Sequence, residues 1–308
     1  MRCNQLTLFS FIDIPSKSHN HMKRALIFIA LLGGALTANA QLLWKVSGNG
    51  LQKPSYLFGT HHIADKTICD GINGFNDAYN SVEQLYGEVD TEKMNGMGTQ
   101  LKMMSQIKLP KGQTLSSLYT EEQLKTIDEF VTSILGVGVK SFDAFKPVMV
   151  SSSLQVFIAM KLYPNYDAKE AIDSYMQSKA KKDKKTVDGL ETIDFQLNLL
   201  YNEPLEKQAA DLLEIAENSK ESEEAIIKLT ELYRQQDLEG MWKLMLEDTE
   251  LEEMEALIFE RNRNWVAQMK EMMPAAPTMF VIGAGHLPGE QGLIKLLETE
   301  GYKLEPVW

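Results

Sequence analysis

The sequence TMFVIGAGHL, residues 278–287, joins a short apolar run to a glycine-rich turn that ends in a histidine. An apolar run of this length is typical of a buried strand. An earlier stretch, YLFGTHHI at residues 56–63, repeats the pattern. In both stretches a strand is followed by Gly-x-x-His, with His62 ending one turn and His286 ending the other. We therefore expect the rest of the chain to bring these two turns together.

Each turn lies within the same order of predicted elements: strand, Gly-x-x-His turn, helix and strand. In the first half the closing strand is QLYGEVD, residues 84–90, which carries Glu88. In the second half it is residues 302–307, where Glu305 would take the corresponding place. The sequence therefore predicts an α/β fold in which two pseudo-repeated halves share a sheet, with a large helical insertion between them.

The insertion, residues 91–260, is predicted to be mainly helical. The capping box Thr120-Glu121-Glu122-Gln123 marks the start of one of its helices. A short strand is expected at Thr186–Val187. The first α/β half then covers residues 41–90, and the second covers residues 261–308.

The N-terminus predicts export. Residues 22–40 combine a basic start, a short apolar core and an Ala-x-Ala ending, which are the parts of a signal peptide. The apolar core is shorter than the roughly 20 residues of a membrane span, although a retained anchor stays open. Cleavage after Ala40 would release a chain whose three histidines all lie in the two turns. Residues 1–21 are interpreted as an extension from an upstream start codon, and the periplasm or the cell surface is the expected location.

The amino-acid composition and the net charge argue against some classes of function. The 308 residues are 44% hydrophobic and 24% charged, which is ordinary for a globular protein. A formal net charge of −12 argues against a general nucleic-acid binder, because such proteins need a basic surface. The two cysteines, Cys3 and Cys69, cannot form an internal disulfide framework.

Histidines that follow buried strands suggest a metal centre. Two such turns could place His62 and His286 opposite each other, and a nearby carboxylate would complete a metal site with an open position for water. Arg261 and Asn264, three residues apart, are expected on one helix face. A structural role for both histidines stays open, because a single Gly-x-x-His is a weak signal. The HExxH and Gly-x-Ser-x-Gly patterns of common hydrolases are absent from the sequence.

Several segments in a fixed order carry a family resemblance. Together they resemble the TraB/GumN family, which includes the pheromone-shutdown protein PrgY and the animal Tiki proteins. The resemblance spans residues 42–308. The segments are YLFGTHH (56–62), the strand with Glu88, Leu190-Glu191-Thr192 with Gln196, Arg261-Asn262 with Trp265, and FVIGAGHL (280–287) through Gly292 and Gly301-Tyr302.

The resemblance implies a fold like that of the erythromycin-esterase/ChaN group, with two related α/β halves and a helical region. It also implies a metal-dependent peptidase whose centre contains the two turn histidines and a glutamate. Carried over, His62 and His286 would bind the metal, and either Glu191 or Glu88 would be the catalytic carboxylate. Arg261 is a further catalytic candidate, for a substrate carboxylate or for negative charge in the transition state.

This sequence departs from the family at His61, where the family often has an apolar residue. Which of His61 and His62 points inward therefore stays open. We expect an exported hydrolase, specifically a peptidase, that uses a divalent metal ion (Mn, Co, Zn or Fe) on a peptide or small-molecule substrate.

Other functions stay open. One alternative is a non-catalytic binding module for a peptide, a haem-like group or a signalling ligand, where haem follows only from the ChaN analogy. A structural envelope protein is another. The sequence leaves the oligomeric state and any association with a membrane surface undecided.

Overall fold

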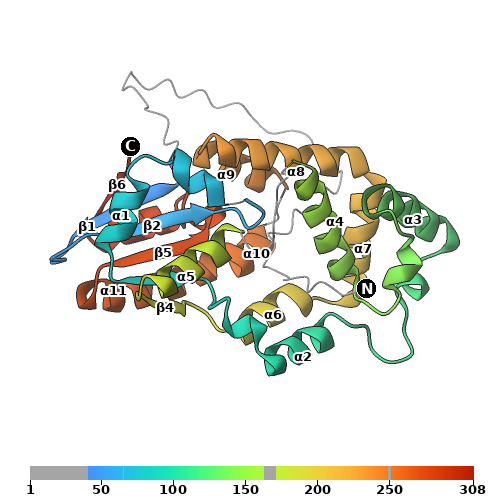
Figure 1. The fold of residues 1–308 in the computed structure, drawn as a ribbon. Helices are drawn as coiled ribbons and strands as arrows, with labels where there is room; N and C mark the ends of the chain where they lie inside the picture. Colours follow the sequence, from blue (N-terminus) through green and yellow to red (C-terminus); the bar gives the residue numbers. More distant parts are fainter. Residues whose placement is uncertain (1–40, 65, 163–170, 249–250) are drawn as a thin grey trace, which may run out of the picture.

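The computed structural model describes residues 41–64, 66–162, 171–248 and 251–308. Its centre is one six-stranded sheet with the strand order β4-β3-β5-β2-β1-β6, shown in Figure 1. Helices accompany the sheet, so the predicted α/β fold is confirmed. The strands are β1 (Leu43–Gly48), β2 (Ser55–Thr60), β3 (Gln84–Gly87), β4 (Thr186–Gly189), β5 (Thr278–Gly283) and β6 (Tyr302–Pro306).

The two Gly-x-x-His turns leave neighbouring strands. β2 and β5 pair in parallel, with Thr60 opposite Gly283 at the end of both strands. β3 pairs in parallel with β5, and β4 pairs in parallel with β3. The carboxyl ends of four strands therefore meet at one edge of the sheet, which is where α/β proteins build their sites.

Both faces of the sheet centre are covered. Every residue of β2 and β5 is buried, as expected for parallel strands with helices on both sides. Figure 1 shows α1 (Phe75–Ser81) and α5 (Ile172–Lys182) in front of the sheet. Side chains from these helices join a continuous core with the strands and with α11 (Glu260–Ala275) and α12 (Leu293–Thr299).

The middle of the chain forms a separate helical region, on the right in Figure 1. The helix start predicted from the capping box at Thr120 is correct. The Thr120 side chain accepts a hydrogen bond from the Gln123 N–H and caps a helix that ends before Gly136. Two smaller apolar clusters hold the region together. The remaining α-helices are α2 (Met97–Gln106), α3 (Glu121–Leu135), α4 (Pro147–Leu162), α6 (Ile193–Tyr201), α7 (Leu205–Glu217), α8 (Ser219–Arg234), α9 (Leu238–Asp248) and α10 (Leu251–Met254).

The two halves share the predicted element order but differ in their last strands. β3 is an inner, parallel strand, whereas β6 lies at the sheet edge and runs antiparallel to β1. The expectation that Glu305 matches Glu88 is therefore wrong. Glu305 pairs with Lys303 on the surface, and β3 ends at Gly87, so Glu88 is the first residue after its strand.

The predicted extension 1–21 and signal peptide 22–40 lie outside the described residues. Within the described ranges, none of the helices is both long enough and apolar enough to cross a membrane.

Candidate functional site

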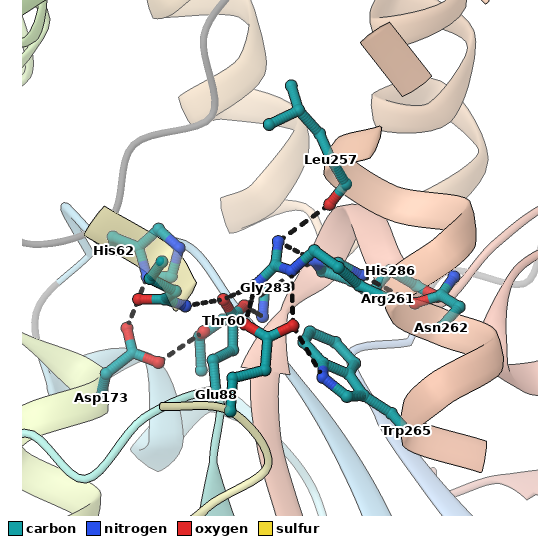
Figure 2. A network of polar contacts seen from close by, with 12 residues as sticks. Thr60, His62, Glu88, Asp173, Leu257, Arg261, Asn262, Trp265, Gly283 and His286 are labelled. Carbon is teal, nitrogen blue, oxygen red and sulfur yellow. Dashed lines mark hydrogen bonds and ion pairs between the residues drawn. The ribbon is translucent and has the colours of Figure 1, made fainter. Parts of the chain in front are cut away.

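Each of the four parallel strands is followed closely by a polar side chain of the candidate site. His62 follows β2, Glu88 follows β3, Glu191 follows β4, and His286 follows β5. Arg261, from the start of α11, reaches into the same place, and Figure 2 shows the resulting network. The structure therefore brings all five predicted site residues to one edge of the sheet.

His62 is held by a carboxylate. Its Nδ1 lies 2.9 Å from Asp173 Oδ2, and the other oxygen of Asp173 accepts from the Thr60 hydroxyl at 2.8 Å. Because a carboxylate oxygen accepts, Nδ1 carries the proton and Nε2 of neutral His62 keeps its lone pair. Burial lowers the pKa of His62, but the charge and hydrogen bond of Asp173 outweigh it, so the pKa is raised above its ordinary value.

His286 is held by an amide instead. Its Nδ1 lies 2.7 Å from Asn262 Oδ1, and the orientation of that amide is fixed because Asn262 Nδ2 donates to the carbonyls of His286 and Gln291. The Trp265 ring packs on the imidazole, with 4.3 Å between ring centroids. Burial and the nearby Arg261 charge lower the pKa of His286 to about 3, so the ring is neutral. Nδ1 is again the protonated nitrogen, and Nε2 carries the lone pair.

Arg261 is buried and fully engaged. Its Nε and Nη2 donate to the two oxygens of Glu191 at 2.9 and 3.0 Å, and Nη2 also donates to Glu88 Oε2 at 2.6 Å. Its Nη1 donates to the Leu257 carbonyl at 2.8 Å and to His286 Nε2 at 3.1 Å. These bonds use all five N–H groups of a guanidinium. Arg261 therefore organises the site and, in this arrangement, has no N–H left for a substrate.

An irregular helical turn precedes Arg261 and contacts its side chain. α10 runs into a π-helical turn, η6 (Glu255–Phe259), which runs into α11. The Leu257 carbonyl that accepts from Arg261 lies in this turn. Single π turns within α-helices are often found at functional sites.

Glu88 is the carboxylate that lies near both histidines. Its Oε1 accepts from the Gly283 N–H at 2.8 Å and lies 3.9 Å from His286 Nε2, and its Oε2 accepts from Gln196 Nε2 at 2.9 Å. Burial raises the pKa of Glu88, but Arg261 and both histidines lower it more strongly, so it stays ionised well below its usual range.

The space beside Gly283 is where these groups meet. A methyl group added there would lie 3.1 Å from Glu88 Oε1, 3.5 Å from His286 Cδ2 and 3.7 Å from His62 Nε2. The two histidines predicted to face each other therefore do converge on one point, and Glu88 is the carboxylate that reaches the same point.

Glu191 has a different place. Its oxygens accept from Arg261, and Oε1 also accepts from Trp265 Nε1 at 3.0 Å. Burial raises its pKa, against the opposing effect of Arg261. Glu191 thus holds Arg261 and Trp265 in position, and Glu88 is the glutamate beside the histidines.

The ambiguity between the adjacent histidines is resolved by the structure. His61 turns away from the site, with Nε2 3.4 Å from the Thr230 hydroxyl and its ring beside Tyr233. On α11, Asn264 is three residues from Arg261, as noted from the sequence, but it is exposed and does not accompany Arg261 into the site. Its place is taken by Asn262, which is fully buried.

Asp173 is the functional candidate that the sequence did not reveal. It is an acidic residue in the first turn of α5, where acidic residues commonly stabilise the helix dipole. Gln196, Asn262 and Trp265 belonged to the resembling segments, but nothing in their spacing indicated their contacts.

The comparison with family models agrees with this geometry. The model described as "TraB/PrgY/gumN family" matches residues 42–306. The chain belongs to the TraB/PrgY/gumN family. No characterised protein and no solved structure that was compared with the chain matched it.

The donor chemistry of this TraB/PrgY/gumN member fits a divalent cation. Metal-binding histidines commonly donate one ring N–H to a carboxylate or an oxygen acceptor and bind the metal with the other nitrogen, as His62 and His286 are arranged to do. Among the described residues of the site, the carboxylates of Glu88 and Glu191 pair with one permanent cation, Arg261, and a third carboxylate, that of Asp173, pairs with His62. Even a protonated His62 leaves negative charge in excess in this buried site.

For His286 to bind an ion, its contact with Arg261 must change. The His286 Nε2 lone pair accepts from Arg261, and among the described residues no three histidine, cysteine, aspartate or glutamate side chains form a ready metal-binding group. The residues therefore have the right chemistry for a metal, with His286 engaged elsewhere.

Proposed function

We propose that this protein is a metal-dependent hydrolase, specifically a peptidase, that is exported to the periplasm or the cell surface. The observation that supports this most is the convergence of His62, His286 and Glu88 beside Gly283, in a buried site with excess negative charge. Buried charge that is not compensated is unfavourable, and a divalent cation would compensate it.

The three converging side chains would hold the metal. His62 and His286 would bind it through Nε2, and Glu88 suits a ligand because its pKa keeps it ionised. A divalent cation here would polarise a substrate carbonyl and lower the pKa of a water molecule. Manganese, cobalt, zinc and iron are the metals to test.

The surrounding residues would orient and balance this centre. Asp173 holds His62 with its proton on Nδ1, and Asn262 does the same for His286. Glu191 and Trp265 fix the Arg261 guanidinium and the His286 ring. The family resemblance makes the peptide amide bond the first substrate class to test.

The test measures metal content and turnover together. Purified protein that begins at Gln41 is dialysed against each metal, and bound metal is measured by mass spectrometry of the elements. Turnover of a peptide library is followed with and without a chelator. We expect close to one metal per chain, chelator-sensitive cleavage, and loss of both in His62→Ala and His286→Ala.

The neighbouring histidine provides a matched control. His61→Ala removes an imidazole from the same turn, but that imidazole faces Thr230 and Tyr233. We expect this variant to keep its metal and its activity. Absence of stoichiometric metal in the wild type, or equal losses in the His61 and His62 variants, would contradict the proposal.

Two further outcomes would change the proposal in part. Retention of an unmodified ligand, without turnover of any peptide, would favour the binding module. Export is tested separately by sequencing the N-terminus of the protein recovered from the periplasm or the cell surface. The sequence should begin at Gln41, and an uncleaved leader would contradict this part.

A further inference from the structure

We propose that Arg261 and the metal compete for His286, so that binding a metal releases one N–H of Arg261 into the site. This inference rests on the proposed function and adds a direct role for Arg261 at the bound substrate. It starts from the bond between Arg261 Nη1 and His286 Nε2, which is 3.1 Å long and lies in the buried part of the site.

The competition follows from the chemistry of one nitrogen. The His286 Nδ1 proton is donated to Asn262 Oδ1, whose amide is fixed by two further hydrogen bonds. The ring therefore offers one lone pair, on Nε2, and a lone pair in the ring plane binds either an N–H or a metal. His286 must exchange Arg261 for the metal.

The rest of Arg261 can stay in place during this exchange. Its other N–H groups bond to Glu191, Glu88 Oε2 and the Leu257 carbonyl, and none of these needs the His286 lone pair. Release therefore frees a single N–H on a guanidinium that is still anchored on the other side. That N–H is placed to stabilise negative charge on a bound substrate, the role that a fully engaged Arg261 cannot perform.

Arg261→Lys is a suitable variant because it keeps the positive charge. An ammonium has three N–H donors, fewer than the four groups that Arg261 serves, and the two carboxylates are the stronger acceptors. His286 Nε2 should therefore lose its competing partner. We expect Zn²⁺ to bind Arg261→Lys about fivefold more tightly than wild type, as estimated from the net strength of one hydrogen bond.

The control is the exposed arginine two residues later. Arg263 bonds to Gln291 and Glu255 outside the site, and Arg263→Lys should leave the affinity for Zn²⁺ unchanged. Affinities are measured by titration calorimetry on the protein that begins at Gln41, with thermal melting to verify that each variant is folded.

A second measurement needs no variant. In wild-type protein labelled with ¹⁵N, saturation with Zn²⁺ should shift the Arg261 Nη1 and His286 Nε2 signals together. Zn²⁺ binding with neither a shift of the Arg261 signals nor a gain in affinity in Arg261→Lys would overturn the competition and leave the proposed function standing. Absence of Zn²⁺ binding in every protein, with no binding of the other metals, would overturn both.

Discussion

The two Gly-x-x-His turns are alike in sequence but opposite in electrostatics. His62 has a carboxylate behind its Nδ1, and its pKa is raised. His286 has a neutral amide behind its Nδ1 and a guanidinium at its Nε2, and its pKa is lowered to about 3. The His286 ring is buried and the His62 side chain is only 11% exposed, so the difference comes mainly from the partners that the rest of the fold provides.

This contrast shows what a motif does and does not determine. The glycine turn after a buried strand places a histidine at the sheet edge, and parallel pairing of β2 with β5 places the two histidines together. Protonation is decided by residues far away in sequence, on α5 and α11. The same fold thus holds one histidine that readily accepts a proton beside another that does not.

The largest loss of stability should come from removing the positive charge of Arg261, which lies beside His286. Arg261→Met would leave Glu88 and Glu191 buried without their partner. Loss of one member of a buried ion pair costs about 3–5 kcal/mol. We expect a decrease of that size in the free energy of unfolding, measured with urea at neutral pH.

The matched control is Arg263→Met, which removes an exposed arginine from the same helix. Its effect should stay within about 0.5 kcal/mol. Similar losses in the two variants would mean that the Arg261 network does not stabilise the fold.

Removing the anion behind His62 should have the next largest effect. Asp173→Asn keeps the shape of the side chain but loses its charge, while burial still acts on the imidazole. We expect the pKa of His62 to fall below 6.5, which would make it resemble His286. Loss of this charged hydrogen bond should destabilise the fold by about 1.5–3 kcal/mol.

The titration of His62 by NMR, in the wild type and in Asp173→Asn, measures the pKa directly. A pKa of His62 that stays raised in the variant would show that Asp173 is not its cause.

The pKa values of His62 and His286 are shifted in opposite directions, and this should appear in the pH dependence of the free energy of unfolding. Because the folded-state pKa of His286 is about 3, the unfolded chain binds more protons below pH 6.5. The contribution of neutral His286 to the free energy of unfolding is complete above pH 6.5 and is smaller by about 2 kcal/mol at pH 5. His62, with a raised pKa, contributes stability below pH 6.5 that is lost as the pH rises through its folded-state pKa.

Urea unfolding between pH 5 and pH 8 separates these two effects. His286→Gln should reduce the loss of stability on the acid side, and His62→Gln should reduce the loss on the alkaline side. Unchanged slopes in both variants would contradict the assigned protonation states.

Much of the arrangement could be predicted because it depends on local pattern. The apolar runs before both turns predicted buried strands, and the concentration of histidines predicted that the turns would meet. Glu88 could be named, as an alternative to Glu191, from its place in a predicted strand and from the family resemblance. The direction and position of β6 could not be predicted, since they depend on pairing with β1 at the far end of the sequence.

The partners of the histidines were beyond sequence patterns for a related reason. Helical spacing groups Arg261 with Asn264, but it does not say which stripe of α11 faces the sheet. Packing turns Asn262 and Trp265 inward and leaves Asn264 in solvent. Asp173 looks like any acidic residue at a helix start, and only the position of α5 beside β3, β4 and β5 brings it to His62.

The smallest change in stability should come from a methyl group at Gly283. Its backbone, with φ −52° and ψ 132°, suits any residue, so alanine adds no strain to the main chain. The methyl would approach Glu88 Oε1 to 3.1 Å, which a shift of a few tenths of an ångström relieves. We expect Gly283→Ala to change the free energy of unfolding by less than about 1 kcal/mol, within the range of mild core substitutions.

The same methyl should weaken metal binding, because it fills the point on which His62, His286 and Glu88 converge. Gly59, the matching glycine of the other turn, is the control, since a methyl there meets Leu287 at 2.9 Å and the Ala284 backbone at 3.1 Å. Gly59→Ala should therefore destabilise the fold by about 1–3 kcal/mol without entering the site. Calorimetric titration with Zn²⁺, together with urea unfolding, distinguishes the two glycines. Equal losses of affinity in both variants would mean that the space beside Gly283 does not receive the metal.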